Sequence, residues 1–171
     1  MTVALKLSDD PNLSALPHLA VQGLIYPPFQ FFNFRLPSYI EYGQGPCLLT
    51  SKLMAFFMLS YMLGNTTYIP HLLTNNHTSP SVKQSEYSCY VSHELLPKEF
   101  QSILGKHEVR LDFGDEIVSA EIEDILLDPY FAPLMAADAE MKKLPPACIV
   151  SAEIDPLRDD SFLAAKRMAI N

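Results

Sequence analysis

Residues 147–160, ACIVSAEIDPLRDD, set the class of fold. The first six of them, 147–152, form a continuous apolar run, which predicts a buried β-strand. Asp155-Pro156 follows as a turn, and Asp-Asp-Ser at 159–161 predicts the cap of a helix over residues 162–170. A buried strand that leads through a short turn into a helix is typical of α/β domains.

A second strand is predicted near the N-terminus, over residues 19–26, LAVQGLIY, just before Pro27-Pro28. A continuous apolar run of this kind is expected in a parallel sheet that is covered on both faces. Two parallel strands do not make a complete sheet, and each would leave an unpaired edge. The sequence therefore predicts an α/β protein in which residues 1–171 form a single, incomplete domain.

A long insert separates the two predicted strands. Residues 29–45 are rich in aromatic side chains and broken by Pro37 and two glycines, so they predict a loop. Residues 52–63 predict a helix that Thr50 or Ser51 caps and Gly64 ends, and its nearly continuous apolar surface must be covered. Residues 65–92 are polar and lack periodicity, which predicts a surface loop of low order. Shorter helical segments are expected over residues 2–7, 95–100, 109–128 and 138–144.

Charge and hydropathy exclude several classes of protein. The chain has 12 basic and 20 acidic residues, a net charge of −8, and no basic cluster, so no nucleic-acid partner is expected. The N-terminus lacks the apolar core of a signal peptide. The most apolar run, LMAFFMLSYML at 53–63, is about 16 Å long as a helix, roughly half of a ~30 Å bilayer core. We therefore expect the helix at 52–63 to be buried or to contact a membrane surface.

The cysteines and the sequons leave two questions open. Cys47, Cys89 and Cys148 are too few for a disulfide framework and lack the spacing of metal ligands, so neither a metal nor a cofactor is expected. Their pairing stays undetermined. Three N-x-S/T sequons, at Asn12, Asn65 and Asn76, would accept glycans only if the chain enters the secretory pathway.

Asp155 is the candidate functional residue. It follows a predicted parallel strand directly, and active-site residues of open α/β sheets lie at the carboxyl ends of strands. A carboxylate there can accept the Nδ1–H of a catalytic histidine and stabilise the imidazolium. The structural alternative is that Asp155 opens a turn while Asp159 or Asp160 caps the next helix, and the residues alone favour this alternative.

The other motifs of common enzyme classes are missing from the sequence. It contains no G-x-S-x-G nucleophile elbow and no glycine-rich phosphate loop. The five histidines are isolated and are expected to be surface or capping residues: His18, His71, His77, His93 and His107.

Four segments nevertheless resemble the arylacetamide deacetylase-like branch of the hormone-sensitive-lipase family of α/β hydrolases. They are VQGLIYPPFQFFNFRLPSY (21–39), LLTSKLMAFFMLSYML (48–63), DPYFAPLMAADAEMKKLPP (128–146) and ACIVSAEIDPLRDDSFLAAKRM (147–168), in the family's order. The most specific is D-P-L-R-D-D after a strand, the acid motif of the family, so the resemblance implies that Asp155 is the acid of a catalytic triad. Ser161 stands where the family usually has glycine.

The resemblance implies a partial α/β-hydrolase fold in which residues 29–127 form a lid or insert region. In the family the oxyanion loop and the G-D-S-A-G-G elbow precede the equivalent of Thr2, and the catalytic histidine follows the equivalent of Asn171. The implied activity is serine carboxylic-ester hydrolysis of apolar acyl esters, and we expect this chain to be inactive by itself.

The resemblance also bears on substrate, location and partners. The aromatic segment 29–34 and the helix at 52–63 would shape an acyl pocket or face a membrane. Members of this branch are located at the endoplasmic-reticulum membrane or in its lumen. The alternative function is a non-catalytic product that binds an apolar ligand, a lipid surface or a full-length relative; the oligomeric state is not determined by the sequence.

Overall fold

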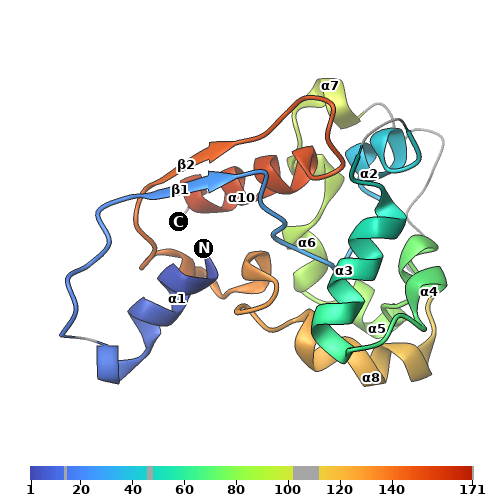
Figure 1. Cartoon of the computed structure of the whole chain (residues 1–171), viewed down its shortest axis with the longest axis horizontal. Coiled ribbons are helices and arrows are strands. Elements are labelled where there is room, and N and C mark those ends of the chain that lie inside the picture. The colour runs from blue at the N-terminus through green and yellow to red at the C-terminus, as the bar shows by residue number, and fades with distance from the viewer. Residues whose placement is uncertain (14, 46–47, 102–111, 171) are drawn as a thin grey trace.

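The computed structural model describes residues 1–13, 15–45, 48–101 and 112–170 (Figure 1). Two strands, β1 and β2, lie beside one another, and short helices make up the remaining regular structure. The helices are α1 Thr2–Asp9, α2 Pro37–Tyr42, α3 Ser51–Leu63, α4 Ile69–Leu73, α5 Pro80–Lys83, α6 Tyr87–Tyr90, α7 Lys98–Gln101, α8 Glu116–Leu126, α9 Asp138–Met141 and α10 Arg158–Ile170. Single 3-10 turns occur at Pro11–Leu13, His93–Leu95 and Pro133–Met135.

The two predicted strands form a parallel pair. β1 spans Gln22–Ile25 and β2 spans Ala147–Val150, in a register that aligns Gln22 with Ala147 and Ile25 with Val150. The peptide bonds that flank the strands extend the ladder, because Gln22 N donates to Pro146 O and Tyr26 N to Val150 O, each at 2.9 Å. This sheet and the helices around it confirm the prediction of a partial α/β fold.

The prediction that both faces of the sheet are covered is wrong within this chain. Leu24 and Ile149 pack against the core, whereas Ile25 is 70% exposed and Val150 47% exposed. Successive side chains of a strand point to opposite faces, and the described elements, α10 among them, cover only one face. Each of the two apolar strands therefore has one face buried against the core and one face exposed to solvent.

Helix α3 begins and ends where the sequence predicts. Thr50 Oγ1 accepts a hydrogen bond from Leu53 N at 3.2 Å, and Gly64 ends the helix with a left-handed φ of 67°, which glycine adopts without strain. The inner face is buried, with Met54, Ala55, Met58 and Leu59 in the core. The expectation that the whole helix is covered is wrong, because its outer face carries exposed aromatic side chains.

Two segments predicted as loops contain helices. Residues 29–45 include α2, whose first residue is Pro37, a residue that the N-terminal turn of a helix tolerates. Residues 65–92 include α4, α5 and α6 instead of a surface loop of low order. This part is ordered around buried polar residues whose partners come from distant sequence: Lys83 Nζ, for example, donates to Asn75 O at 2.7 Å and to Phe113 O.

The helices between the strands and the C-terminal helix share one hydrophobic core. It includes Phe29 and Phe34, Leu59 of α3, Leu126 of α8 and Leu163 of α10. In Figure 1, helices α2 to α8 gather on the side of the molecule away from α1, and α10 lies against the sheet. The boundaries 29–127 of a lid or insert region stay a prediction.

The cysteines and the sequon asparagines differ in their exposure. Cys89 and Cys148 are exposed free thiols, and Cys47 lies outside the described residues. Asn12 and Asn65 are exposed, whereas Asn76 is half-buried and its sequon partner Thr78 is fully buried. The use of these sequons stays undetermined. Within the described ranges, no helix combines the length and apolar character needed to cross a bilayer.

Candidate active site

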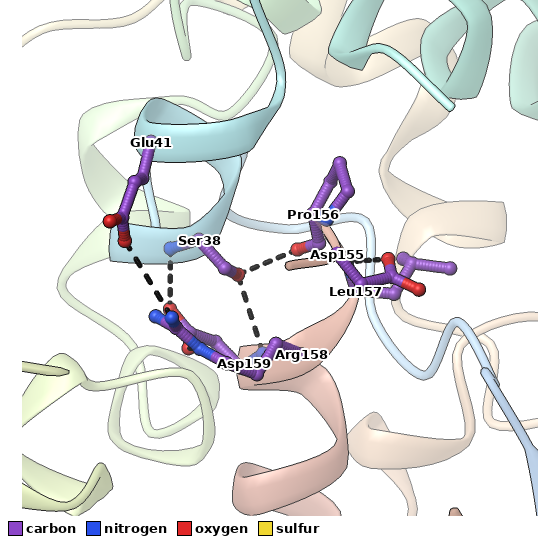
Figure 2. A network of polar contacts seen from close by, with 7 residues as sticks. All are labelled: Ser38, Glu41, Asp155, Pro156, Leu157, Arg158 and Asp159. Atoms are coloured by element: carbon purple, nitrogen blue, oxygen red, sulfur yellow. Dashed lines mark hydrogen bonds and ion pairs between the residues drawn. The ribbon is translucent and has the colours of Figure 1, made fainter. Parts of the chain in front are cut away.

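Residues 151–157 join β2 to α10 and hold Asp155 in a tight turn (Figure 2). We call this segment the acid loop. Asp155 Oδ1 accepts a hydrogen bond from Leu157 N at 2.7 Å, and Asp155 O accepts one from Arg158 N at 3.1 Å. In the described part of the chain, Asp155 Oδ2 has no hydrogen-bond partner. The turn and the catalytic interpretation are therefore compatible, because the turn occupies one carboxylate oxygen and leaves the other for an imidazole N–H.

The prediction that Asp159 or Asp160 caps the following helix is wrong. Helix α10 begins at Arg158, so both aspartates lie in its first turn, and their carboxylates bind segments far away in sequence. Asp159 Oδ2 accepts a hydrogen bond from Ser38 N of α2 at 2.7 Å. Ser38 Oγ in turn donates to Pro156 O at 2.6 Å, as Figure 2 shows, so these bonds tie the start of α2 to the acid loop.

Arg158 adds a second set of contacts between α10 and α2. Its Nε donates to Asp159 Oδ1 at 2.9 Å, and its Nη1 lies 3.6 Å from Glu41 Oε2. The guanidinium also lies over the ring of Phe100, 3.8 Å from the ring centre. Since the Arg158 side chain is almost completely buried, these partners compensate for the loss of its hydration.

Asp160 binds the aromatic segment that precedes α2. Its Oδ2 accepts from Phe29 N at 2.9 Å and from Gln30 N at 3.3 Å. Its Oδ1 accepts from Gln30 Nε2 at 3.1 Å and from the Tyr39 hydroxyl at 3.0 Å. Burial raises the pKa of Asp160 to about 7, and the four hydrogen bonds oppose that rise by favouring the charged form. Two adjacent aspartates before a helix are typical of a cap, so the sequence does not predict that Asp160 holds this aromatic segment.

His77 is buried, so its expected surface or capping position is wrong. Its Nε2 lies 2.9 Å from Phe31 O, and its ring packs edge-on against Phe34. Burial lowers the pKa of His77 to about 4, which keeps the imidazole neutral. No histidine of the described ranges bonds to Asp155.

Asp160 and His77 make opposite contributions to the pH dependence of stability. Asp160 binds a proton more tightly in the folded state, so its contribution to stability falls as pH rises from the ordinary aspartate pKa of 3.8 to about 7. His77 binds a proton more weakly when folded, so its contribution falls as pH drops from 6.5 to about 4. Between these limits the two contributions nearly cancel.

We expect His77→Gln to reveal the contribution of Asp160 to the pH dependence of stability, because glutamine does not titrate. Its amide can still donate a hydrogen bond to Phe31 O. The unfolding free energy of the wild type minus that of the variant should rise by about 1.4 kcal/mol per pH unit between about pH 4.5 and 6. Urea titrations at several pH values measure this difference. His18→Gln, at an exposed position, is the matched control, and a slope equal to that of the control would contradict the buried, neutral state of His77.

An apolar cleft of about 230 Å³ adjoins the acid loop. Phe31 and Phe131 line it together with Met58 and Tyr61 of α3, and Leu157 of the acid loop completes the wall. Both segments expected to shape an acyl pocket, 29–34 and 52–63, therefore contribute to one cleft. A second cleft of about 340 Å³ shares Phe31, Tyr61 and Phe131 with the first, so the two are contiguous. Asp155 binds the backbone N–H of Leu157, whose side chain lines the cleft.

Comparison with known proteins identifies similar sequences and a fold family. The α/β hydrolase fold family matches residues 98–171. Neutral cholesterol ester hydrolase 1 of Rattus norvegicus is 32% identical over 152 residues, which cover 88% of this chain and 36% of that protein. Arylacetamide deacetylase of Bos taurus is 30% identical over 166 residues, 97% of this chain and 40% of that protein. Arylacetamide deacetylase-like 4 of Homo sapiens is 33% identical over 155 residues, 91% and 37% of the two chains. No solved structure matches the chain.

The parallel strands and the acid loop after β2 define the class as an α/β hydrolase fold. Within this class the chain is similar in sequence to arylacetamide deacetylases and to neutral cholesterol ester hydrolase. These relatives are an ester hydrolase and a deacetylase by name. The chain spans only 36% to 40% of the length of the three relatives named above.

Proposed function

We propose that this chain carries the acid and part of the acyl-binding cleft of a serine carboxylic-ester hydrolase that acts on apolar acyl esters. The observation that supports this most is the position of Asp155: it lies in the loop after β2, keeps one oxygen without a described partner, and binds the backbone of Leu157, which lines an apolar cleft. A carboxylate in this position orients a catalytic histidine through its Nδ1–H and stabilises the imidazolium formed when the histidine takes the proton of the serine.

The cleft supports an apolar acyl group as the part of the substrate bound by these residues. Its walls are aromatic and aliphatic side chains, which favour an acyl chain over a charged or strongly hydrated group. The reaction would proceed by attack of a serine on the ester carbonyl, formation of an acyl-enzyme with loss of the alcohol, and hydrolysis of the acyl-enzyme by water. The acid alone does not start this sequence, because it neither attacks the carbonyl nor accepts the proton of the serine.

We expect the 171-residue chain by itself neither to react with a fluorophosphonate serine probe nor to hydrolyse a p-nitrophenyl acyl ester. The physical reason is that no serine of this sequence lies in a G-x-S-x-G elbow, which exposes the nucleophile beside backbone N–H donors. Gel-based labelling and absorbance of released p-nitrophenol measure the two activities. Labelling that a single Ser→Ala substitution abolishes would contradict the proposal that the nucleophile is missing from this sequence.

The alternative proposal is a non-catalytic chain that binds an apolar ligand in the same cleft, and the cleft itself is the observation in its favour. The two proposals differ in what Asp155 does, because ligand binding to Phe31 and Met58 does not need a carboxylate. The location at the endoplasmic reticulum implied by the resemblance, and the association with a full-length relative, stay predictions.

A further inference from the structure

We propose that the outer face of α3 docks on the surface of a lipid bilayer, with Phe56, Phe57 and Tyr61 inserted at the boundary between headgroups and acyl chains. This inference extends the proposed function by naming the place from which an apolar ester would reach the cleft. The docking itself does not depend on Asp155, so it can be tested separately from catalysis.

The first observation is the exposure of aromatic side chains on one helix. Phe56 is 44% exposed, Phe57 57% and Tyr61 82%, although the opposite face of α3 is buried in the core. Aromatic rings are favoured at the membrane interface, where the ring contacts the acyl region and a hydroxyl remains hydrated. Lys52 at the start of the helix is exposed, and its long side chain can reach lipid phosphates.

The second observation is the charge distribution around α3. Residues 42–85, about a quarter of the chain, contain no aspartate or glutamate, although the whole chain has 20 acidic residues and a net charge of −8. Glu121 of α8 reaches this region at its edge, where it accepts a hydrogen bond from Tyr68. Docking through residues 42–85 therefore buries no carboxylate side chain of these residues, whereas a face rich in acidic residues would lose hydration at high cost on entering the lipid.

The third observation is the continuity between this face and the apolar cleft. Phe57 and Tyr61 line the cleft as well as being exposed. Tyr61 stacks on Phe131 with the ring centres 5.7 Å apart and the planes 12° from parallel. Phe57 and Tyr61 therefore form part of the rim of the cleft, so an acyl chain could leave the bilayer and enter the cleft without crossing water.

A lipid surface fits this face better than a second copy of the chain. A stable protein interface buries about 1,200 Å² or more, counted over both partners. Phe56, Phe57 and Tyr61 are only partly exposed, so a two-fold contact through them would bury about 700 Å² from both copies together. The exposed rings of α3 are too small an area for a stable dimer. Insertion of a few aromatic rings into a bilayer requires no matching surface on a partner.

The absence of tryptophan from the sequence makes the test direct. Phe57→Trp places a single tryptophan on the proposed docking face and keeps an aromatic ring there. We expect its emission to shift to shorter wavelength when phosphatidylcholine vesicles are added, and to be quenched by brominated phosphatidylcholine. Ile117→Trp, at a position 75% exposed on the acid-rich helix α8, is the matched control and should show neither change.

A second measurement uses vesicle sedimentation of the full chain. Replacing Phe56, Phe57 and Tyr61 together by serine should weaken partitioning into phosphatidylcholine vesicles by at least about tenfold, because the inserted apolar area is lost. Asp155→Asn should bind vesicles like the wild type, which separates this proposal from the proposed function.

Three results would overturn the docking proposal. The first is an equal spectral shift for Phe57→Trp and Ile117→Trp, which would mean non-specific adsorption. The second is a shift of Phe57→Trp that depends on protein concentration and needs no vesicles, which would mean self-association through α3. The third is unchanged sedimentation of the triple serine variant when its circular dichroism matches that of the wild type.

Discussion

Asp155→Asn should lower kcat for an apolar ester by about 10⁴-fold in a chimera in which this chain replaces the matching segment of bovine arylacetamide deacetylase. That segment covers 40% of the bovine protein and 97% of this chain. Asparagine keeps the shape of the side chain, and its Oδ1 can still accept the hydrogen bond from Leu157 N. The amide cannot hold a histidine in the tautomer that accepts the serine proton, and it cannot stabilise the imidazolium. The loss should therefore appear in kcat, while the thermal stability of the chimera stays close to that of its parent.

Glu153→Gln is the matched control for this prediction. Glu153 lies two residues before Asp155 in the same loop, and it is exposed. Its substitution removes one negative charge from the acid loop without changing the proposed triad, so kcat should be nearly unchanged. Equal losses in the two variants would show that the charge of the loop matters and the position of Asp155 does not. Full activity of Asp155→Asn in an active chimera would exclude Asp155 as the triad acid.

Asp160→Ala should destabilise the isolated chain by about 4 kcal/mol, a large share of the 5–15 kcal/mol that is typical of a folded domain. The substitution leaves three buried donors without an acceptor, Phe29 N, Gln30 N and the Tyr39 hydroxyl, while Gln30 Nε2 keeps Asn33 O as its acceptor. Water that enters the cavity and the removal of a buried carboxyl group offset part of this cost. Urea unfolding followed by circular dichroism measures the change.

Two variants define the origin of the Asp160 effect. Asp160→Asn keeps one acceptor oxygen but directs an amide NH₂ group at two of the donors, so we expect about half the loss seen with alanine. Asp124→Asn, at an exposed position of α8, should change stability by no more than about 0.5 kcal/mol. If Asp160→Ala and Asp124→Asn behaved alike, Asp160 would not hold the aromatic segment in place. Loss of that segment would also open the wall of the cleft that contains Phe31.

The elements that were predicted correctly depend on contacts within a few residues of one another. Helix α3 is bounded by Thr50, whose side chain binds the backbone of Leu53, and by Gly64, whose conformation ends the helix. The strands β1 and β2 follow from short apolar runs, and the turn at Asp155 forms with Leu157. Helix caps, apolar runs and turns depend on residues that are adjacent in sequence, so they can be predicted from the sequence alone.

The errors fall where partners are distant in sequence. Residues 65–92 are polar, which is typical of a solvated loop, yet Lys83 and Asn75 are buried in it because distant backbone groups bind them. Lys83 Nζ donates to Phe113 O, and Asn75 Oδ1 accepts from Phe34 N. The sequence also predicts α3 as uniformly apolar and therefore covered. Which face of a uniformly apolar helix is buried depends on the helices beside it. The residues of α3 alone do not determine which of its faces is buried.

The sequence by itself determined the parallel strands, the acid loop and Asp155 as its candidate catalytic residue, because each depends on residues that are neighbours along the chain. Only the tertiary structure decided that Asp159 and Asp160 hold the start of α2 and the aromatic segment against α10, since Ser38 and Phe29 lie 121 and 131 residues away from them. A buried carboxylate binds whichever backbone N–H groups the fold brings within about 3 Å. The partners of such a group are therefore fixed by the packing of the whole domain and not by its neighbours in sequence.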